Sequence, residues 1–409
     1  MTRYDKYKPS GIEWIGDIPE HWEVKRLKRF AKICNGQDHK SVYELDGEYP
    51  IMGSGGEFGR ANSFLHPGPS VLLGRKGTVD KPRYVDFPFW SVDTAYFTDI
   101  YEITNPRFFY YLCTTINFEL YKYGSAVPSM SQEVLNQIEF TSPPTSEQTA
   151  IATYLDRKTA EIDRIIAYKQ KLIVLYEEEK QTIINQAVTR GVDKTVKLKP
   201  SGVEWLGDIP EHWEVKKLKW LHGTMSGGTP KTSDSNYYEG DIPWLRSLDL
   251  NNGDVTDCEI RITQKAIAES ATKIVPLNSV LLAMYGGAGT IGKSGLLKFE
   301  ATINQAICAI IPNEQTLPEY LHYFVIFYRP YWMIGAEGTR RDPNISQDDI
   351  KNREFLFPPS KEQLDIVSYI EKECSRLDTL IVKYKKQIAL FQEYRTTLIS
   401  EVVTGKVKV

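Results

Sequence analysis

Residues 8–28 read KPSGIEWIGDIPEHWEVKRLK, and residues 199–219 read KPSGVEWLGDIPEHWEVKKLK, so one stretch occurs twice, 191 positions apart. A second motif is repeated in the same order, because FTSPPTSEQ at 140–148 recurs as FLFPPSKEQ at 355–363. We call the first repeat the framing segment. Since framing segment, dissimilar middle and long helical pattern follow each other twice, the sequence predicts two copies of one structural plan.

The composition is that of an ordinary globular protein. The chain has 409 residues, of which 41% are hydrophobic and 25% are charged. Neither an apolar leader nor a run of 18 apolar residues is visible, so we expect no signal peptide, no membrane span and a cytoplasmic location. The five cysteines form no CxxC pair and are interpreted as reduced thiols.

The charge distribution limits how the chain can bind nucleic acid. The net charge is −3. The middle at 31–140 holds 9 Lys/Arg against 13 Asp/Glu, and the middle at 222–355 holds 12 against 16. Any DNA-binding face must therefore be a local basic patch on a mildly acidic body.

A long helix is predicted behind each PPxxEQ motif. Apolar residues recur every three or four positions over 151–187 and over 366–402, as on one face of an amphipathic helix. The segments 145–148 and 360–363 have the pattern of a capping box at a helix start. A helix over 146–188 would be on the order of 60 Å long. Because it cannot bury its apolar stripe alone, we expect the two helices to pack on each other.

The two middles share a β-rich style that is broken by Gly and Pro turns. Each contains an aromatic-rich helical pattern, beginning at Pro106 and Pro318, and each closes with a Ser–Gln–acid trio that we expect to cap a short helix. The expected strands are 49–52, 70–73, 83–85 and 95–97 in the first middle and 242–245, 279–283 and 306–311 in the second.

This order of motifs resembles the specificity (S) subunit of type I restriction–modification systems, over essentially the whole chain. The resemblance rests on the framing segment PSGxEWxGDIPEHW, on the PPxxEQ helix entry and on several motifs that look like parts of target-recognition domains. Those motifs are LGRKG at 73–77, FWSVDTAY at 89–96, SGGTPK at 226–231, ATINQAI at 301–307 and GTRRDPNI at 338–345.

The resemblance implies an α+β fold. Two globular α/β target-recognition domains would be separated by a long antiparallel two-helix coiled coil, with a pseudo-twofold internal repeat. The implied boundaries are a framing segment at 1–30, a first recognition domain at 31–140, a central framing helix at 141–197, a second framing segment at 198–221, a second recognition domain at 222–355 and a C-terminal framing helix at 356–409.

The same resemblance implies a non-catalytic subunit that binds a bipartite site on double-stranded DNA, one half-site per recognition domain. Two modification (methyltransferase) subunits would dock on the framing segments, and restriction (endonuclease and translocase) subunits would join them. No cofactor, metal site or catalytic residue is expected in this chain. S-adenosylmethionine would belong to the modification partner, and ATP with Mg would belong to the restriction partner.

Basic residues in Gly-rich turns are the candidates for DNA contact, because Arg pairs bidentately with guanine and Lys or Arg neutralises phosphate. Solvated loop charge is the alternative for each of them. Four tryptophans in the framing segments are expected to pack loops against the helices and to share that surface with a docking partner. The DNA candidates are Arg60, Arg75, Lys76, Lys81, Arg83, Lys231, Arg246, Lys293, Arg340 and Arg341, and the tryptophans are Trp14, Trp22, Trp205 and Trp213.

Two other functions stay open from the residues alone. The stretch Gly287–Ser294 matches the phosphate-loop pattern GxxxxGK[ST], which would make the chain a nucleotide-binding enzyme. A phosphate loop needs a helix starting at Lys293, and Gly295 is a poor residue for one, so a β-hairpin is the favoured interpretation. The third possibility is an antirestriction-like scaffold that carries the framing segments and reads no sequence.

Overall fold

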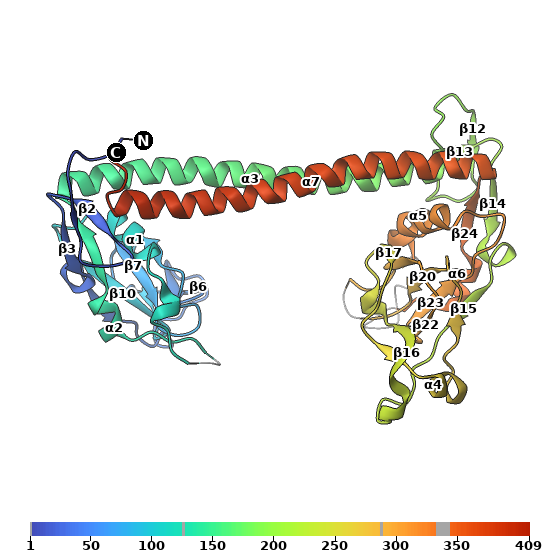
Figure 1. Ribbon diagram of the computed structural model, residues 1–409, viewed down its shortest axis with the longest axis horizontal. Helices are drawn as coiled ribbons and strands as arrows, with labels where there is room; N and C mark the ends of the chain where they lie inside the picture. The colour runs from blue at the N-terminus through green and yellow to red at the C-terminus, as the bar shows by residue number, and fades with distance from the viewer. Residues whose placement is uncertain (1, 125–126, 287–288, 333–343) are drawn as a thin grey trace. The chain divides into compact units, whose positions relative to one another are not determined.

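The computed structural model describes residues 2–124, 127–286, 289–332 and 344–409. The chain divides into two compact units, the first made of Met1–Lys171 with Tyr384–Val409 and the second of Leu172–Lys383. The two long helices, α3 (Thr145–Arg190) and α7 (Ser360–Val403), each contribute one part to each unit. The units are described one at a time below (Figure 1).

The first unit has two main sheets, with strand orders β4-β10-β7-β8 and β6-β5-β9, and two further strand pairs, β1-β2 and β3-β11. Its helices are α1 (Pro106–Thr114) and α2 (Gln132–Gln137) together with its parts of α3 and α7. Its strands are β1 (Tyr7–Pro9), β2 (Asp17–Pro19), β3 (Glu23–Arg26), β4 (Ala31–Asn35), β5 (Tyr49–Gly53), β6 (Gly56–Ala61), β7 (Ser70–Gly74), β8 (Arg83–Val85), β9 (Trp90–Ser91), β10 (Ala95–Ile100) and β11 (Glu139–Ser142).

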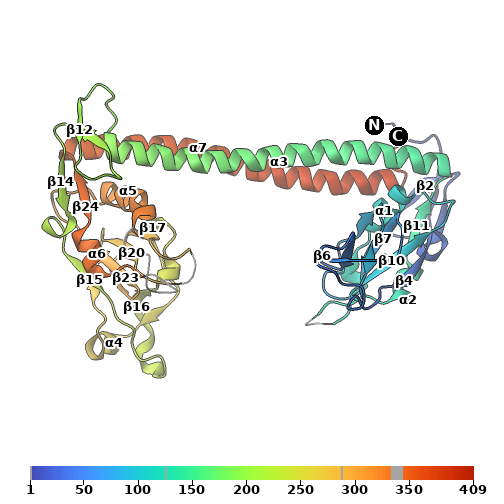
Figure 2. The same ribbon diagram turned by 180° about the vertical axis from the view of Figure 1, so that it is seen from behind.

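Helix α1 joins the sheet of the first unit to its long helices. In both views it lies between the helix pair and the strands (Figures 1 and 2). Phe108, Phe109 and Leu112 are buried in one core that also takes in Leu155 of α3 and Leu398 of α7. Asn105 caps α1 by accepting hydrogen bonds from two backbone N–H groups of its first turn.

The second unit repeats this plan with additional strands. Its main sheets have the orders β15-β23-β20-β21-β17 and β18-β16-β22-β19, and its further pairs are β12-β13 and β14-β24. Its helices are α4 (Gln264–Glu269), α5 (Pro318–Tyr328) and α6 (Gln347–Asn352) with its parts of α3 and α7. Its strands are β12 (Leu198–Pro200), β13 (Asp208–Pro210), β14 (Glu214–Lys217), β15 (Thr224–Ser226), β16 (Tyr238–Leu245), β17 (Gly253–Val255), β18 (Arg261–Ile262), β19 (Ile274–Val275), β20 (Val280–Ala283), β21 (Ser294–Leu297), β22 (Ala301–Ile303), β23 (Ile307–Ile310) and β24 (Glu354–Phe357).

Helix α5 of the second unit has the role that α1 has in the first, since it lies between the helix pair and the strands (Figure 1). Short helices precede the last strand of both units, as the Ser–Gln–acid trios predict. Ser131 accepts from the backbone N–H of Val134 at the start of α2, and Ser346 accepts from that of Asp349 at the start of α6. The predicted strands of the two middles are also present.

The long helices pack on each other in both units, as expected from their apolar stripes. In the first unit Asp163 of α3 pairs with Arg395 of α7 at 3.0 Å, and Lys169 donates to Gln387 at 2.7 Å. In the second unit Lys180 of α3 donates to Asp378 of α7 at 2.5 Å, while Ile184 shares a core with Ile370. Because the residue numbers rise along α3 as they fall along α7, the two helices run antiparallel.

Each long helix ends at a glycine that packs on a framing-segment tryptophan. Gly191 follows α3 with φ +73°, and a Cβ there would lie 3.3 Å from the Trp213 ring. Gly405 follows α7 with φ +75°, and its Cβ would lie 2.4 Å from Pro19 and 3.0 Å from the Trp22 ring. Glycine is the residue that takes positive φ without strain, so it both stops the helix and makes room for the indole.

Candidate functional site

Trp22 and Trp213 tie the framing segments to the long helices, as the sequence predicts. Both are fully buried. The indole nitrogen of Trp22 donates to Glu147 at the start of α3 at 3.0 Å, and that of Trp213 donates to Glu362 at the start of α7 at 2.9 Å. Together with the glycine contacts, each tryptophan thus joins the start of one long helix to the end of the other within its own unit.

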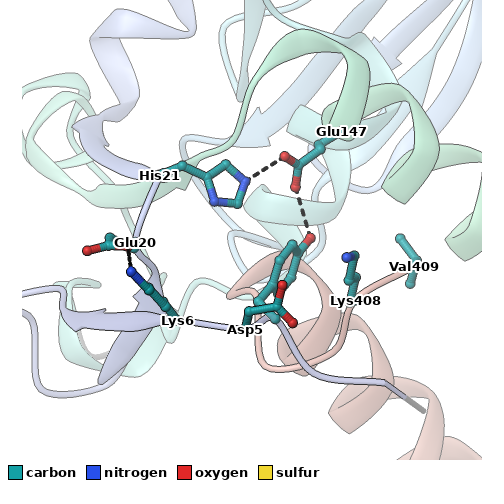
Figure 3. A pocket seen from close by; sticks show the side chains of 8 residues that line it. Asp5, Lys6, Glu20, His21, Glu147, Lys408 and Val409 are labelled. Carbon is teal, nitrogen blue, oxygen red and sulfur yellow. Dashed lines mark hydrogen bonds and ion pairs between the residues drawn. The ribbon is translucent and has the colours of Figure 1, made fainter.

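We call the junction of framing segment and long helix in each unit a clamp. A histidine side chain adds a further contact to each clamp. His21 lies 2.6 Å from the second oxygen of Glu147, and His212 lies 2.6 Å from Glu362. Figure 3 shows the His21 ring pointing at the Glu147 carboxylate. Burial alone raises the pKa of Glu147, but hydrogen bonds from His21, Trp22 and Tyr4 outweigh burial and hold that pKa below its usual range.

The interpretation of the PPxxEQ motif as a capping box is wrong, because Gln148 and Gln363 do not turn back to cap their own helices. Both side chains are buried. Gln148 accepts from the backbone N–H of Asn105, just before α1, at 2.9 Å and donates to the Pro143 carbonyl at 3.0 Å. Gln363 accepts in the same way from the N–H of Leu317, before α5, at 2.7 Å. The glutamines therefore fix the entry of α1 and α5.

The other two tryptophans of the framing segments differ between the units. Trp14 is 47% exposed. Trp205 packs on Tyr328 and Tyr331, with ring centroids 4.7 and 4.5 Å away. Those tyrosines belong to the end of α5 and to the turn η6 (Arg329–Tyr331) that follows it. A nearly identical framing segment thus presents a free indole in one unit and a covered indole in the other.

Loops gather in the first unit where the parallel strands β5 and β9 end. The backbone N–H groups of Arg75 and Lys76 donate to the Thr94 carbonyl at 2.9 and 3.1 Å, and that of Gln37 donates to Ser91 at 2.8 Å. These bonds hold the loops after β4, β7 and β9 together. We call the cluster the first loop edge, made of residues 36–38, 54–56, 75–77 and 92–94.

The second unit builds the same arrangement where the parallel strands β16 and β22 end. The Met284 N–H donates to the Ala306 carbonyl at 2.8 Å, and the Gly228 N–H donates to Ile303 at 3.0 Å. We call this cluster the second loop edge, made of residues 227–231, 246–249, 284–286 and 304–306. In both units main-chain hydrogen bonds thus join a set of loops at the end of a parallel strand pair.

Most of the basic candidates that the structure describes lie on or beside these edges. Arg75 and Lys76 lie on the first loop edge, and Arg83 reaches it by donating to the Gly55 carbonyl at 2.8 Å. Lys231 and Arg246 lie on the second loop edge. These side chains stay candidates for contact with DNA phosphates on an otherwise acidic body, and Arg246 is also paired with Asp249 at 3.7 Å.

Other candidates are placed differently. Arg60 lies on β6, where it pairs with Glu57 at 3.1 Å. Lys81 is exposed on the loop between β7 and β8. Lys293 borders the second loop edge, because its carbonyl accepts from the Ala283 N–H at 2.8 Å. Arg340 and Arg341 lie outside the described residues.

The segment that matches the phosphate-loop pattern continues into a β-hairpin. Strand β21 begins at Ser294 and pairs antiparallel with β20, with Leu282 opposite Ser294 and Leu281 opposite Gly295. Gly287 and Ala288 lie outside the described residues. A phosphate loop requires a helix that begins at its lysine, whereas a strand follows Lys293 here. The nucleotide-binding interpretation is therefore wrong, because the helix that it requires is absent at this place.

Neither a metal-binding cluster nor a membrane-spanning helix occurs among the described residues. No group of three or more His, Cys, Asp or Glu side chains in this part of the chain is arranged to hold a metal ion. No described helix is both long and apolar enough to cross a lipid bilayer.

Sequence reasoning missed the clamp residues Glu147 and Glu362 and the entry-fixing Gln148 and Gln363. The signal was present, since Glu and Gln recur together at the same place in both PPxxEQ motifs. A capping box would need only the glutamine of this Glu–Gln pair. That both residues recur in both motifs indicates two separate partners, and the structure shows them: the framing segment for the glutamate and the loop before α1 or α5 for the glutamine.

Comparison with known proteins agrees with this architecture. The MjaIX type I restriction enzyme specificity subunit of Methanocaldococcus jannaschii is 31% identical over 192 residues, which span 46% of this chain and 43% of that relative. The EcoKI specificity subunit of Escherichia coli K12 is 24% identical over an alignment of 431 positions that spans 96% of this chain and 90% of the relative. The first alignment thus spans less than half of the relative, whereas the second spans nearly all of it.

A solved structure shares the fold. It is described as "Structural basis underlying complex assembly and conformational transition of the type I R-M system", and one of its chains matches with a TM-score of 0.74 at 15% identity, over 95% of this chain and 99% of that chain. The family model for the type I restriction modification DNA specificity domain matches residues 19–173 and again 210–390. Because these two matches cover most of both copies of the repeated plan, the chain belongs to the type I restriction–modification specificity-subunit family.

Proposed function

We propose that this chain is the non-catalytic subunit that selects the DNA site of a type I restriction–modification complex, with one half of a bipartite site read by each unit. The observation that carries the proposal is the pair of loop edges. Each follows a parallel strand pair, is held by the same main-chain hydrogen bonds and carries basic side chains. Phosphate contacts made by such side chains orient a protein on a duplex, and base contacts beside them select the sequence.

The proposed recognition domains are residues 31–140 and 222–355. Residues 1–30 and 198–221 are the proposed framing segments, and residues 141–197 and 356–409 carry the framing helices. Two modification subunits would dock where the framing segments meet the helices, and restriction subunits would join that core. S-adenosylmethionine, ATP and Mg would be bound by those partners. A chain that acts on cellular DNA with such partners would be cytoplasmic.

Replacing two basic residues in one unit at a time tests whether each unit reads one half-site. The complex of this chain with its modification subunits is assayed on duplexes in which either half-site is scrambled. Arg75→Ala with Lys76→Ala should weaken binding through one half-site, and Arg246→Ala with Lys293→Ala should weaken binding through the other. Loss of both half-sites in equal measure in either variant would contradict the assignment of one reader to each unit.

The same assay separates this proposal from a scaffold that reads no sequence. The unmodified complex should prefer one bipartite site over random duplex by a factor of at least 10³ at physiological salt, as specific DNA-binding proteins do. Equal binding to all duplexes would favour the scaffold.

A further inference from the structure

Asp93 and Gln305 occupy the same position in the two units, although their surrounding sequences differ. Each is the second residue after the shorter strand of the parallel pair, β9 or β22. The residue before each makes the same backbone bond across that pair, and the residue after each accepts from the loop that follows β7 or β20. These bonds are Val92 N–H to Met52 O at 3.0 Å and Asn304 N–H to Leu245 O at 2.9 Å, then Arg75 N–H to Thr94 O at 2.9 Å and Met284 N–H to Ala306 O at 2.8 Å.

The Gln305 side chain is exposed on the second loop edge and yet held in one orientation. The Thr229 hydroxyl donates to its carbonyl oxygen. The Tyr285 hydroxyl is hydrogen-bonded to the same side chain. An exposed glutamine that is fixed by two neighbours has already lost the rotamer freedom that binding would otherwise remove, so it is preorganised for a partner.

The fixed amide keeps enough hydrogen-bonding capacity to read a base. A glutamine side chain offers two acceptor positions on its oxygen and two N–H donors. Thr229 uses one acceptor position and the Tyr285 oxygen accepts one N–H, which leaves one acceptor position and one donor. The remaining acceptor and donor match the N6 amino group and the N7 atom that adenine presents in the major groove.

Asp93 presents a different chemistry at the equivalent place on the first loop edge. It is exposed, and no Lys, Arg or His among the described residues forms an ion pair with its carboxylate. The neighbouring Arg75 guanidinium approaches the Asp93 backbone carbonyl at 3.5 Å. A carboxylate so placed is repelled by phosphates and accepts hydrogen bonds only, so its partner on DNA is an exocyclic amino group, cytosine N4 or adenine N6.

We propose that Asp93 and Gln305 form one shared base-reading position, used once in each half-site. Gln305 reads adenine, and Asp93 accepts from the amino group of cytosine or adenine. The inference rests on the proposed function and extends it to particular side chains. It also explains how one backbone plan reads two unlike half-sites, because the same position carries an amide in one unit and a carboxylate in the other.

The test is the base preference of the whole complex at every position of its site. The complex of this chain with its modification subunits is given a duplex library in which each base pair of the site is varied, and methylated products are sequenced. Gln305→Ala should lower discrimination at one base pair of one half-site by roughly 5- to 150-fold. Asp93→Ala should do the same in the other half-site. Gln305→Glu should move the preference from adenine toward cytosine, because a carboxylate accepts from cytosine N4.

Matched controls are an exposed glutamine and an exposed aspartate that lie off the two loop edges. Gln264 is exposed at the start of α4, and Asp86 is exposed just after β8, beyond the residue that pairs with Ser70. Gln264→Ala and Asp86→Asn should leave the base preference unchanged. A glutamine that merely holds the Thr229 loop would weaken all sequences alike when it is replaced, and Gln305→Glu would then move no preference.

Three results would overturn the inference. They are unchanged discrimination in both alanine variants, loss at the same half-site in both, and uniform weakening without a change at any single base pair. Each of these leaves the proposed function standing as long as the unmodified complex prefers one bipartite site. Absence of any site preference in the unmodified complex would instead remove the proposed function.

Discussion

The indole nitrogen of Trp22 donates a 3.0 Å hydrogen bond to Glu147, and this bond fastens the framing segment to the first turn of α3. The second unit repeats the bond between Trp213 and Glu362 at 2.9 Å. The donors are fully buried indoles, so each has no water to replace its acceptor. This bond explains one part of the sequence repeat, because both copies keep the tryptophan and the glutamate that join the framing segment to the long helix.

Removal of the acceptor should destabilise one unit at a time. Glu147→Ala leaves the Trp22 N–H buried without a partner, which typically costs about 1–3 kcal/mol. The expected result is a lower urea midpoint for the transition that includes the first unit, and Glu362→Ala should lower that of the second. Tryptophan fluorescence during urea unfolding measures both. Glu178→Ala, at an exposed position of α3, is the control and should change neither midpoint.

Gly36 and Gly227 should each be essential for one half-site. A Cβ at Gly36 would lie 2.0 Å from the Val92 carbonyl oxygen, and one at Gly227 would lie 1.7 Å from the Ile303 oxygen. The Ile303 oxygen belongs to β22, and the Val92 oxygen directly follows β9, so alanine must displace the loop that carries the glycine. Either Gly→Ala variant should therefore lose binding to one half-site in the duplex assay. The matched control is Gly55→Ala on the first loop edge, since a Cβ there meets no atom within 4 Å. Retained binding to both half-sites by Gly36→Ala would contradict this account of the edge.

The stability of the second unit should fall in mild acid. Burial lowers the pKa of His322 on α5 to about 4, below the usual value near 6.5. Between those two values the unfolded chain binds a proton that the folded chain does not, so unfolding becomes easier as the pH falls through 6.5 toward 4. The contribution between pH 8 and pH 5 is about 2 kcal/mol.

Urea midpoints at pH 8 and pH 5 measure this effect. His322→Phe cannot take up the proton, so its midpoint should change less with pH than that of the unmodified chain. An equal pH dependence in His322→Phe and the unmodified chain would show that the buried imidazole is not responsible.

Lys293 should act as a phosphate contact on DNA and not as part of a nucleotide site. Lys293→Ala should weaken DNA binding to a similar degree for all sequences. It should also reduce the slope of log K against log salt by about 1, because one fewer counterion is released. Titration over a range of salt concentrations measures the slope. Binding of ATP that disappears in Lys293→Ala would instead restore the nucleotide-binding alternative.

Local patterns predict the elements of this fold well. The PPxxEQ motifs mark the starts of α3 and α7, and the Ser–Gln–acid trios mark α2 and α6, because helix starts depend on residues within one turn. The hairpin after β20 also follows from its sequence, since Gly295 disfavours a helix. These are features in which the deciding interactions are close along the chain.

Contacts between residues far apart in the sequence could not be predicted from these local patterns. Gln148 has the spacing of a cap, but it serves the loop before α1, more than 40 residues earlier in the chain. The equivalence of Asp93 and Gln305 is hidden because the middles have diverged, and it is carried by backbone hydrogen bonds that leave no trace in side-chain identity. The basic residues chosen from the sequence lie both on the loop edges and away from them, because a charged residue in a turn does not reveal which residues surround it in the fold.

The order in which the chain is made has a consequence for its folding. Every residue of the second unit has been synthesised once residue 383 is added, whereas the first unit still lacks Tyr384–Val409. That last segment supplies Val402 and Val403 to the core around Trp22. Domains usually fold in the order of their synthesis, but here the unit that contains the N-terminus is completed last. A ribosome that stops after residue 383 but before Val402 therefore releases a chain in which the second unit is complete and the first unit lacks part of its core.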